Sequence, residues 1–173
     1  MTQKAIDRMK NHPEGFVLQV EAGKVDWAAH GNDIAGLIYD QTAHDEAINV
    51  AIDFAEQDND TLVIITTDHG NSNPGVISGG KANDNFDAIQ NYKHSNEWIL
   101  NGFGKETSIS QIKERVSYAN NFAVTNEEAK LILSYYQDIK SEDGLYNARH
   151  LPFRVMAEIQ KQHNSVGWIS MQH

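Results

Sequence analysis

The chain has no cysteine and no long apolar run, and its positive charges are few. The absence of cysteine excludes disulfides and cysteine-based zinc sites. No stretch approaches the roughly 18 consecutive apolar residues of a membrane-spanning helix, so no membrane span is expected. Lys and Arg total 14 against 24 Asp and Glu, and the formal charge of −10 argues against a nucleic-acid partner. The 173 residues are 40% hydrophobic, which is typical of one globular domain.

Two short apolar runs predict buried strands. They cover residues 16–20 and 62–66. The residues between them carry apolar side chains at helical spacing over 34–55, with Asn32 or Asp33 as the helix cap. A strand–helix–strand unit predicts a right-handed crossover and a parallel pair, and therefore an α/β fold.

Acidic and imidazole side chains follow both predicted strands. Glu21, Asp26 and His30 come after the first, and Asp68 and His69 come after the second. Helical spacing would put Asp26 and His30 on one face, whereas the adjacent Asp68 and His69 could share an ion only on irregular backbone. Mixed carboxylate and imidazole ligands suit zinc, while the lone carboxylate of Glu21 suits magnesium. Two metal ions side by side would serve phosphoryl transfer.

At these positions the sequence resembles the alkaline phosphatase family. The similarity is carried by residues 16–21, 24–30, 32–33 and 61–69. It implies two zinc ions and one magnesium ion. It assigns Asp26 and His30 to the first zinc, Asp68 and His69 to the second, and Glu21 to the magnesium.

The resemblance continues at the end of the chain. Residues 167–173 are similar to the strand that leads to a further histidine of the first zinc, which makes His173 the matching residue. No Asp-Ser pair occurs, although the family's nucleophilic serine sits in such a motif. The family's phosphate-binding arginine and its bridging N-terminal aspartate also have no counterpart. We therefore expect a C-terminal fragment of an alkaline phosphatase, without a catalytic residue of its own and inactive alone.

The expected organisation has three parts. Residues 1–70 form the metal-binding part of a three-layer sandwich with a parallel-rich central sheet, and residues 166–173 return to it as a strand. Residues 71–165 form a largely helical insertion, a crown-like subdomain that shapes access or subunit contacts. Its helices are expected around 86–103, 109–118, 126–139 and 152–162, where Thr125 and Glu128 form a capping box and Pro152 opens the last helix.

The resemblance implies a phosphomonoester hydrolase that works through a phosphoseryl intermediate, with a small phosphomonoester as substrate. It also implies a periplasmic or secreted location and leaves a homodimer open. Two alternatives stand beside it. The run from Asp68 to Asn71 also resembles the cofactor-independent phosphoglycerate mutases, and the missing nucleophile favours a metal-binding half-domain without activity.

Other aromatic and imidazole residues are weaker candidates. Trp27 either lines the pocket or is simply packed. His150 is a surface residue unless the insertion turns it toward the site. The remaining histidines fit no ligand spacing and are interpreted as surface or structural residues: His12, His44, His94 and His163.

Overall fold

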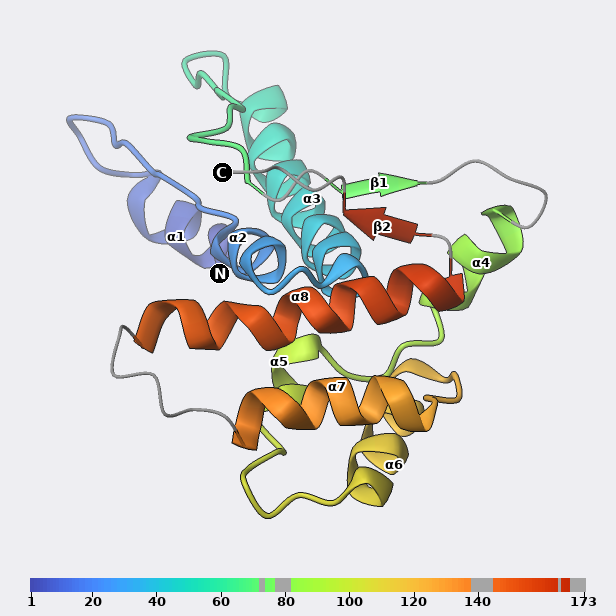
Figure 1. The fold of residues 1–173 in the computed structure, drawn as a ribbon. Coiled ribbons are helices and arrows are strands. Elements are labelled where there is room, and N and C mark those ends of the chain that lie inside the picture. Colours follow the sequence, from blue (N-terminus) through green and yellow to red (C-terminus); the bar gives the residue numbers. More distant parts are fainter. Residues whose placement is uncertain (72–73, 77–81, 138–144, 165, 169–173) are drawn as a thin grey trace.

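The structure is a computed structural model that describes residues 1–71, 74–76, 82–137, 145–164 and 166–168, and helices dominate it (Figure 1). No helix in these ranges is both long and apolar enough to cross a bilayer. In chain order the elements are α1 (Thr2–Met9), α2 (Gly23–His30), α3 (Ile34–Gln57), β1 (Pro74–Val76), α4 (Ala82–Ile89), α5 (Asn96–Leu100), α6 (Ile109–Asn120), α7 (Asn126–Gln137), α8 (Leu145–Asn164) and β2 (Val166–Trp168).

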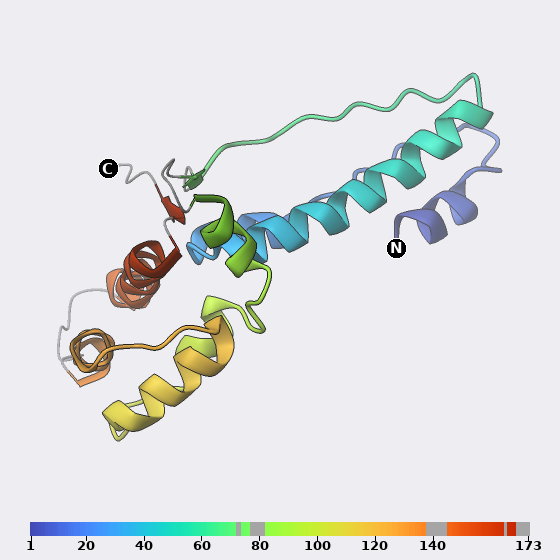
Figure 2. The same cartoon turned by 90° about the vertical axis from the view of Figure 1, so that its right-hand side faces the viewer.

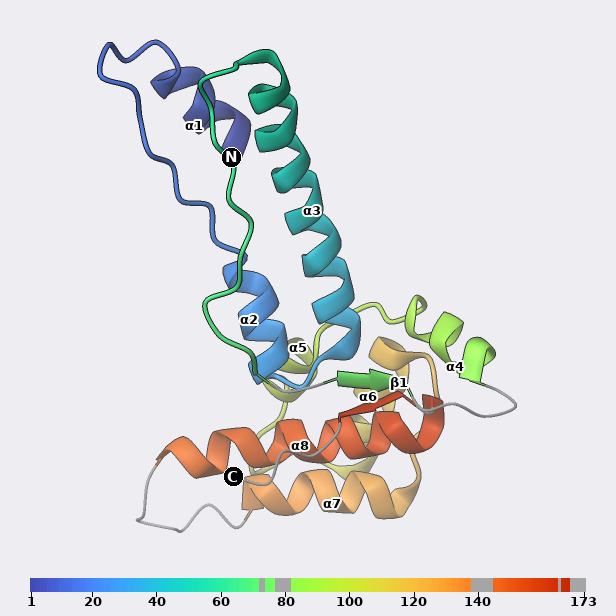
Figure 3. The same ribbon diagram turned by 90° about the horizontal axis from the view of Figure 1, so that it is seen from above.

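The elements form an arm and a helical body. The arm consists of α1, α2 and α3, with α1 against the far end of α3 and α2 beside its start (Figure 3). The body consists of α4 to α8, and the start of α3 lies against it. From the far end of α3, the extended residues 61–70 run back along the helix toward the body (Figure 2). The segments before and after α3 thus both lead to the site described below.

The main hydrophobic core lies in the body. Its buried side chains come from α5 to α8 and from the loop before α7, because each of these helices turns one apolar face inward. A smaller cluster of Ile34, Ala35 and Ile89 joins the start of α3 to α4. The main core comprises Ile99, Leu100, Ile112, Val116, Ala119, Val124, Ala129, Ile132, Val155, Met156 and Ile159.

The predicted parallel-rich sheet is wrong for this structure. Residues 16–20 and 62–66 are extended, but neither run is a strand. The strands in the described ranges are β1 and β2, which pair antiparallel with Val76 opposite Val166. A strand needs a partner for its backbone groups, and these two runs have none in the described part of the chain. Several of their apolar side chains are accordingly exposed: Val17 by 96%, Leu62 by 81% and Ile64 by 75%.

The helix predictions are better. The helix over 34–55 is confirmed as α3, with Asp33 as its cap, since the Asp33 carboxylate accepts a bond from the Gly36 amide at 2.8 Å. The helices around 109–118 and 126–139 are confirmed as α6 and α7. The single helix over 86–103 is wrong, because a turn separates α4 from α5. The start of the last helix is also wrong: α8 begins at Leu145 and continues through the buried Pro152.

The predicted capping box of α7 is present and is joined by a histidine. The Thr125 amide donates to the Glu128 carboxylate at 2.7 Å, and the Glu128 amide donates to the Thr125 hydroxyl at 3.2 Å. His163 of α8 lies 3.0 Å from the same carboxylate and stacks on Phe122 at 4.3 Å between ring centroids. His163 is therefore structural, and it locks the end of α8 to the start of α7.

This cluster predicts a loss of stability in acid. Burial raises the pKa of the Glu128 carboxyl, but the bonds from Thr125 and His163 outweigh burial and hold the pKa below its usual value. A carboxyl with a lowered folded-state pKa stabilises the fold above its unfolded pKa and loses that contribution as the pH falls through the folded value. We expect Glu128→Gln to flatten the dependence of the unfolding free energy on pH below about pH 4.5. Urea titrations at several pH values would measure the unfolding free energy. A pH dependence equal to that of the wild type would contradict the prediction.

Candidate metal centre

The last turn of α2 presents two candidate ligands on one face. Asp26 and His30 are one helical turn apart, and the His30 Nε2 lies 3.5 Å from the Asp26 Oδ1. The side chains keep 35% and 57% of their surface exposed, so a ligand can reach both. The helical spacing expected from the sequence is confirmed here.

The second pair arrives from the extended segment that runs back along α3. The His69 Nε2 lies 3.7 Å from the Asp26 Oδ1 and 3.6 Å from the Asp68 Oδ2. The backbone is irregular at this point, as expected: the Thr67 hydroxyl donates to the His69 carbonyl at 2.8 Å. The Asp26 carboxylate therefore lies between two imidazoles from distant parts of the chain, and we call Asp26, His30, Asp68 and His69 the ligand cluster.

Asn71 is a member of the site that the sequence did not reveal as one. Its Nδ2 donates to the Asp26 Oδ1 at 2.9 Å, across 45 residues of sequence. A hydrogen-bonded ligand carboxylate is held in one orientation, which is the usual role of the groups around a metal site. The sequence offers one indication of this role, because Asn71 stands two residues after His69. An amide side chain does not by itself suggest a metal ligand.

The electrostatics of the ligand cluster favour a cation. Hydrogen bonding from the His69 amide, at 2.9 Å, holds the pKa of the Asp68 carboxyl below its usual value. Asp68 is therefore an anion at neutral pH, and 82% of its side chain is exposed. Two carboxylates beside two imidazole nitrogens form a negative, nucleophilic group that a divalent cation would neutralise.

The spacing of the donor atoms fits zinc. Tetrahedral zinc bonds of about 2.0–2.2 Å put neighbouring ligand atoms about 3.3–3.6 Å apart. The nitrogen–oxygen separations of 3.5, 3.6 and 3.7 Å in the ligand cluster are close to that range. Within the described ranges, however, no group of three or more acidic or imidazole side chains is arranged to hold one ion. The pairs fit in chemistry and spacing, and a complete coordination sphere requires further ligands.

The other predicted site residues are not part of the ligand cluster as the structure describes it. Glu21 is exposed just before α2. Trp27 is 72% exposed, so it is not packed in a core. His150 lies within α8, and its side chain is outside the described part of the structure. His173 lies outside the described residues altogether.

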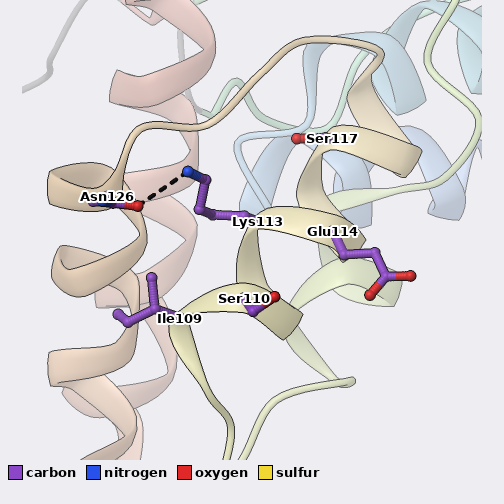
Figure 4. Close-up of a pocket in the computed structure, with 6 residues that line it drawn as sticks. All are labelled: Ile109, Ser110, Lys113, Glu114, Ser117 and Asn126. Carbon is purple, nitrogen blue, oxygen red and sulfur yellow. Dashed lines mark hydrogen bonds between the residues drawn. The ribbon is translucent and has the colours of Figure 1, made fainter.

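A shallow hollow on the body does not belong to this site. It is lined by α6 residues and by the start of α7, and Lys113 donates across it to Asn126 at 3.0 Å (Figure 4). Its residues belong to α6 and α7, whereas the ligand cluster lies on α2 and on the segment that follows α3. The residues of this hollow are Ile109, Ser110, Lys113, Glu114, Ser117 and Asn126.

Known proteins resemble this chain over its whole length. The family model for alkaline phosphatase matches residues 1–173. Alkaline phosphatase 4 of Bacillus subtilis is 31% identical over 173 residues, which are all of this chain and 35% of that protein. Alkaline phosphatase H of Pseudomonas aeruginosa is 44% identical over 72 residues, 42% of this chain and 15% of that protein.

Solved structures agree with these matches. The crystal structure of Thermus thermophilus alkaline phosphatase superposes with a TM-score of 0.86 at 27% identity, over 98% of this chain and 38% of that one. The chain thus spans little more than a third of the length of the Bacillus subtilis and Thermus thermophilus proteins. Because the family model covers every residue, the chain belongs to the alkaline phosphatase family.

Proposed function

We propose that this chain supplies zinc ligands to a phosphomonoester hydrolase of the alkaline phosphatase type. The observation that carries the proposal is the position of Asp26 between His30 and His69, which brings two separate sequence motifs to one point. Family membership supports the reaction class. Small phosphomonoesters are the proposed substrates.

The proposed roles of the individual side chains follow the resemblance to the alkaline phosphatase family. Asp26 and His30 would hold a first zinc, and Asp68 and His69 a second, with Glu21 directed to a magnesium ion and His173 to the first zinc. Bound zinc would supply Lewis acidity toward the phosphoryl and leaving oxygens. Asn71 orients the Asp26 carboxylate by its 2.9 Å bond.

A phosphoseryl intermediate is proposed for the complete site. Its serine is proposed to lie outside these 173 residues, since the chain has no Asp-Ser pair. The chain by itself is therefore proposed to bind metal without turnover, as a metal-binding half-domain. The mutase alternative is not favoured, because the alkaline phosphatase model accounts for the whole chain.

Two further properties remain proposals. A periplasmic or secreted location follows from the family, and a homodimer is the assembly to be tested by the mass of the protein in solution. Neither property bears on the chemistry of the ligand cluster.

The test is a zinc titration of the chain, combined with a phosphatase assay at alkaline pH. We expect zinc to bind and a generic phosphomonoester to remain uncleaved. His30→Ala should weaken binding, whereas His44→Ala, in the middle of α3, should not. Turnover by the purified chain would show that a nucleophile is present in it, and equal zinc affinity in His30→Ala and the wild type would reject the ligand assignment.

A further inference from the structure

Three buried polar side chains join the arm to the body. They are Asp33, the cap of α3; Asn96, at the start of α5; and Gln160, in α8. They are 4%, 1% and 2% exposed, respectively. Burying such groups is costly unless each is hydrogen-bonded, so their partners show what the cluster holds in place.

The Asp33 carboxylate holds the starts of two helices together. One oxygen accepts from the Gly36 amide in α3 at 2.8 Å, and the other accepts from the Asn96 amide in α5 at 2.7 Å. Residues 33 and 96 are far apart in sequence. A single carboxylate thus fixes the first residue of α5 directly beneath the loop that joins α2 to α3.

The Asn96 side chain reaches that loop itself. Its Nδ2 donates to the carbonyl of Asn32 at 3.1 Å, with the carbonyl of Gly31 at 3.4 Å. Two carbonyl acceptors require the amide nitrogen on this side, and the Oδ1 on the other side accepts from the Gln160 Nε2 at 2.7 Å. The bond from Gln160 therefore fixes the orientation of the Asn96 side chain.

The loop held in this way follows His30 directly. Gly31 ends α2, and Asn32 turns the chain with a left-handed φ of 47°. A side chain at Gly31 would come within 3.4 Å of the Trp27 carbonyl and 3.6 Å of the Phe153 ring of α8. The end of α2 therefore lies close against the body, and His30 is its last residue.

We propose that Asn96, oriented by Gln160, is a positioning residue for His30. By holding the carbonyls of Gly31 and Asn32, the body sets the last turn of α2 and so the separation of the His30 and Asp26 side chains. The helical body is then part of the metal site although it contributes no ligand from its described residues. This inference rests on the proposed function only in naming zinc as the ion that His30 binds.

Asn96→Ala tests the proposal with two readouts. The imidazole NMR resonances of His30 in the metal-free chain report its position, and a zinc titration reports affinity. We expect the His30 resonances to move while those of His44 stay, and zinc affinity to fall about 10- to 100-fold, the range for groups that orient metal ligands. Gln160→Ala should act in the same direction with a smaller effect.

Asn120→Ala is the matched control. Asn120 is also a buried asparagine of the body, 2% exposed, and its side-chain amide has no hydrogen-bond partner among the described residues. It should leave His30 and zinc affinity unchanged. Unmoved His30 resonances in Asn96→Ala would overturn the proposal, as would an equal shift in Asn120→Ala.

The two proposals fail in different ways. A wild-type chain that binds no zinc would reject the proposed function, while the His30 resonances would still decide the positioning role. If Asn96→Ala does not fold, by far-ultraviolet circular dichroism, Gln160→Ala gives the decision. Unchanged His30 resonances in that folded variant would then reject the role of the Asn96–Gln160 pair.

Discussion

Asp26→Ala is expected to weaken zinc binding by at least about 100-fold, the upper end of what the loss of an outer partner of a metal ligand costs. The effect should be large because one oxygen of Asp26 faces both His30 and His69, at 3.5 and 3.7 Å. Without it, two imidazoles remain with no carboxylate between them. Isothermal titration with zinc, after removal of bound metal by a chelator, would measure the change.

The control for Asp26→Ala is Asp53→Ala in the exposed part of α3. It removes the same charge from the same chain, far from the ligand cluster. If both variants lost affinity equally, the effect would come from net charge alone. If Asp26→Ala retained wild-type affinity, Asp26 would not be a ligand, and the assignment of His30 would fail with it.

Ile132→Ala is expected to lower the free energy of unfolding by about 2–5 kcal/mol, as for large-to-small changes in a well-packed core. Ile132 of α7 is completely buried, among side chains from α5, α6 and α8. The change removes apolar contacts and leaves a cavity in the only extensive core of the described residues. Urea unfolding followed by circular dichroism would give the difference.

Leu131 provides the control at the neighbouring position. It is 48% exposed, so Leu131→Ala should change stability by no more than about 0.5 kcal/mol. A loss at position 131 as large as that at position 132 would mean that α7 is packed differently. The ratio of the two effects therefore tests which face of α7 is buried.

The two pairs of the ligand cluster were predictable because the signal of each pair is local. The spacing of Asp26 and His30 determines their geometry on any helix, and the Asp68–His69 pair is recognisable by residue type alone. Asn71 and Asn96 were missed because amide side chains have no ligand signature. Their roles depend on contacts across 45 and 64 residues of sequence, which no local pattern encodes.

Some of the helices were predictable because each carries its own sequence pattern. The strands were not, because a strand forms only where it pairs with another. The caps and apolar spacing of α3, α6 and α7 are readable from a single segment. A strand exists only with its partner, so the apolar runs at 16–20 and 62–66 were assigned a structure that the described chain does not complete. Pro152 misled for a related reason, since a packed helix can tolerate a proline that an isolated helix could not.

The β1–β2 pair has a consequence for the order of folding. It joins residues about 90 apart, and closing so long a loop costs about 4 kcal/mol in its length-dependent entropy alone. Two short strands cannot offset that cost in an unfolded chain. If α4 to α8 have already folded, however, the two ends are brought close together beforehand. The body should therefore form first and the β1–β2 pair last, so that His69, which lies five residues before β1, is among the last side chains to reach its place.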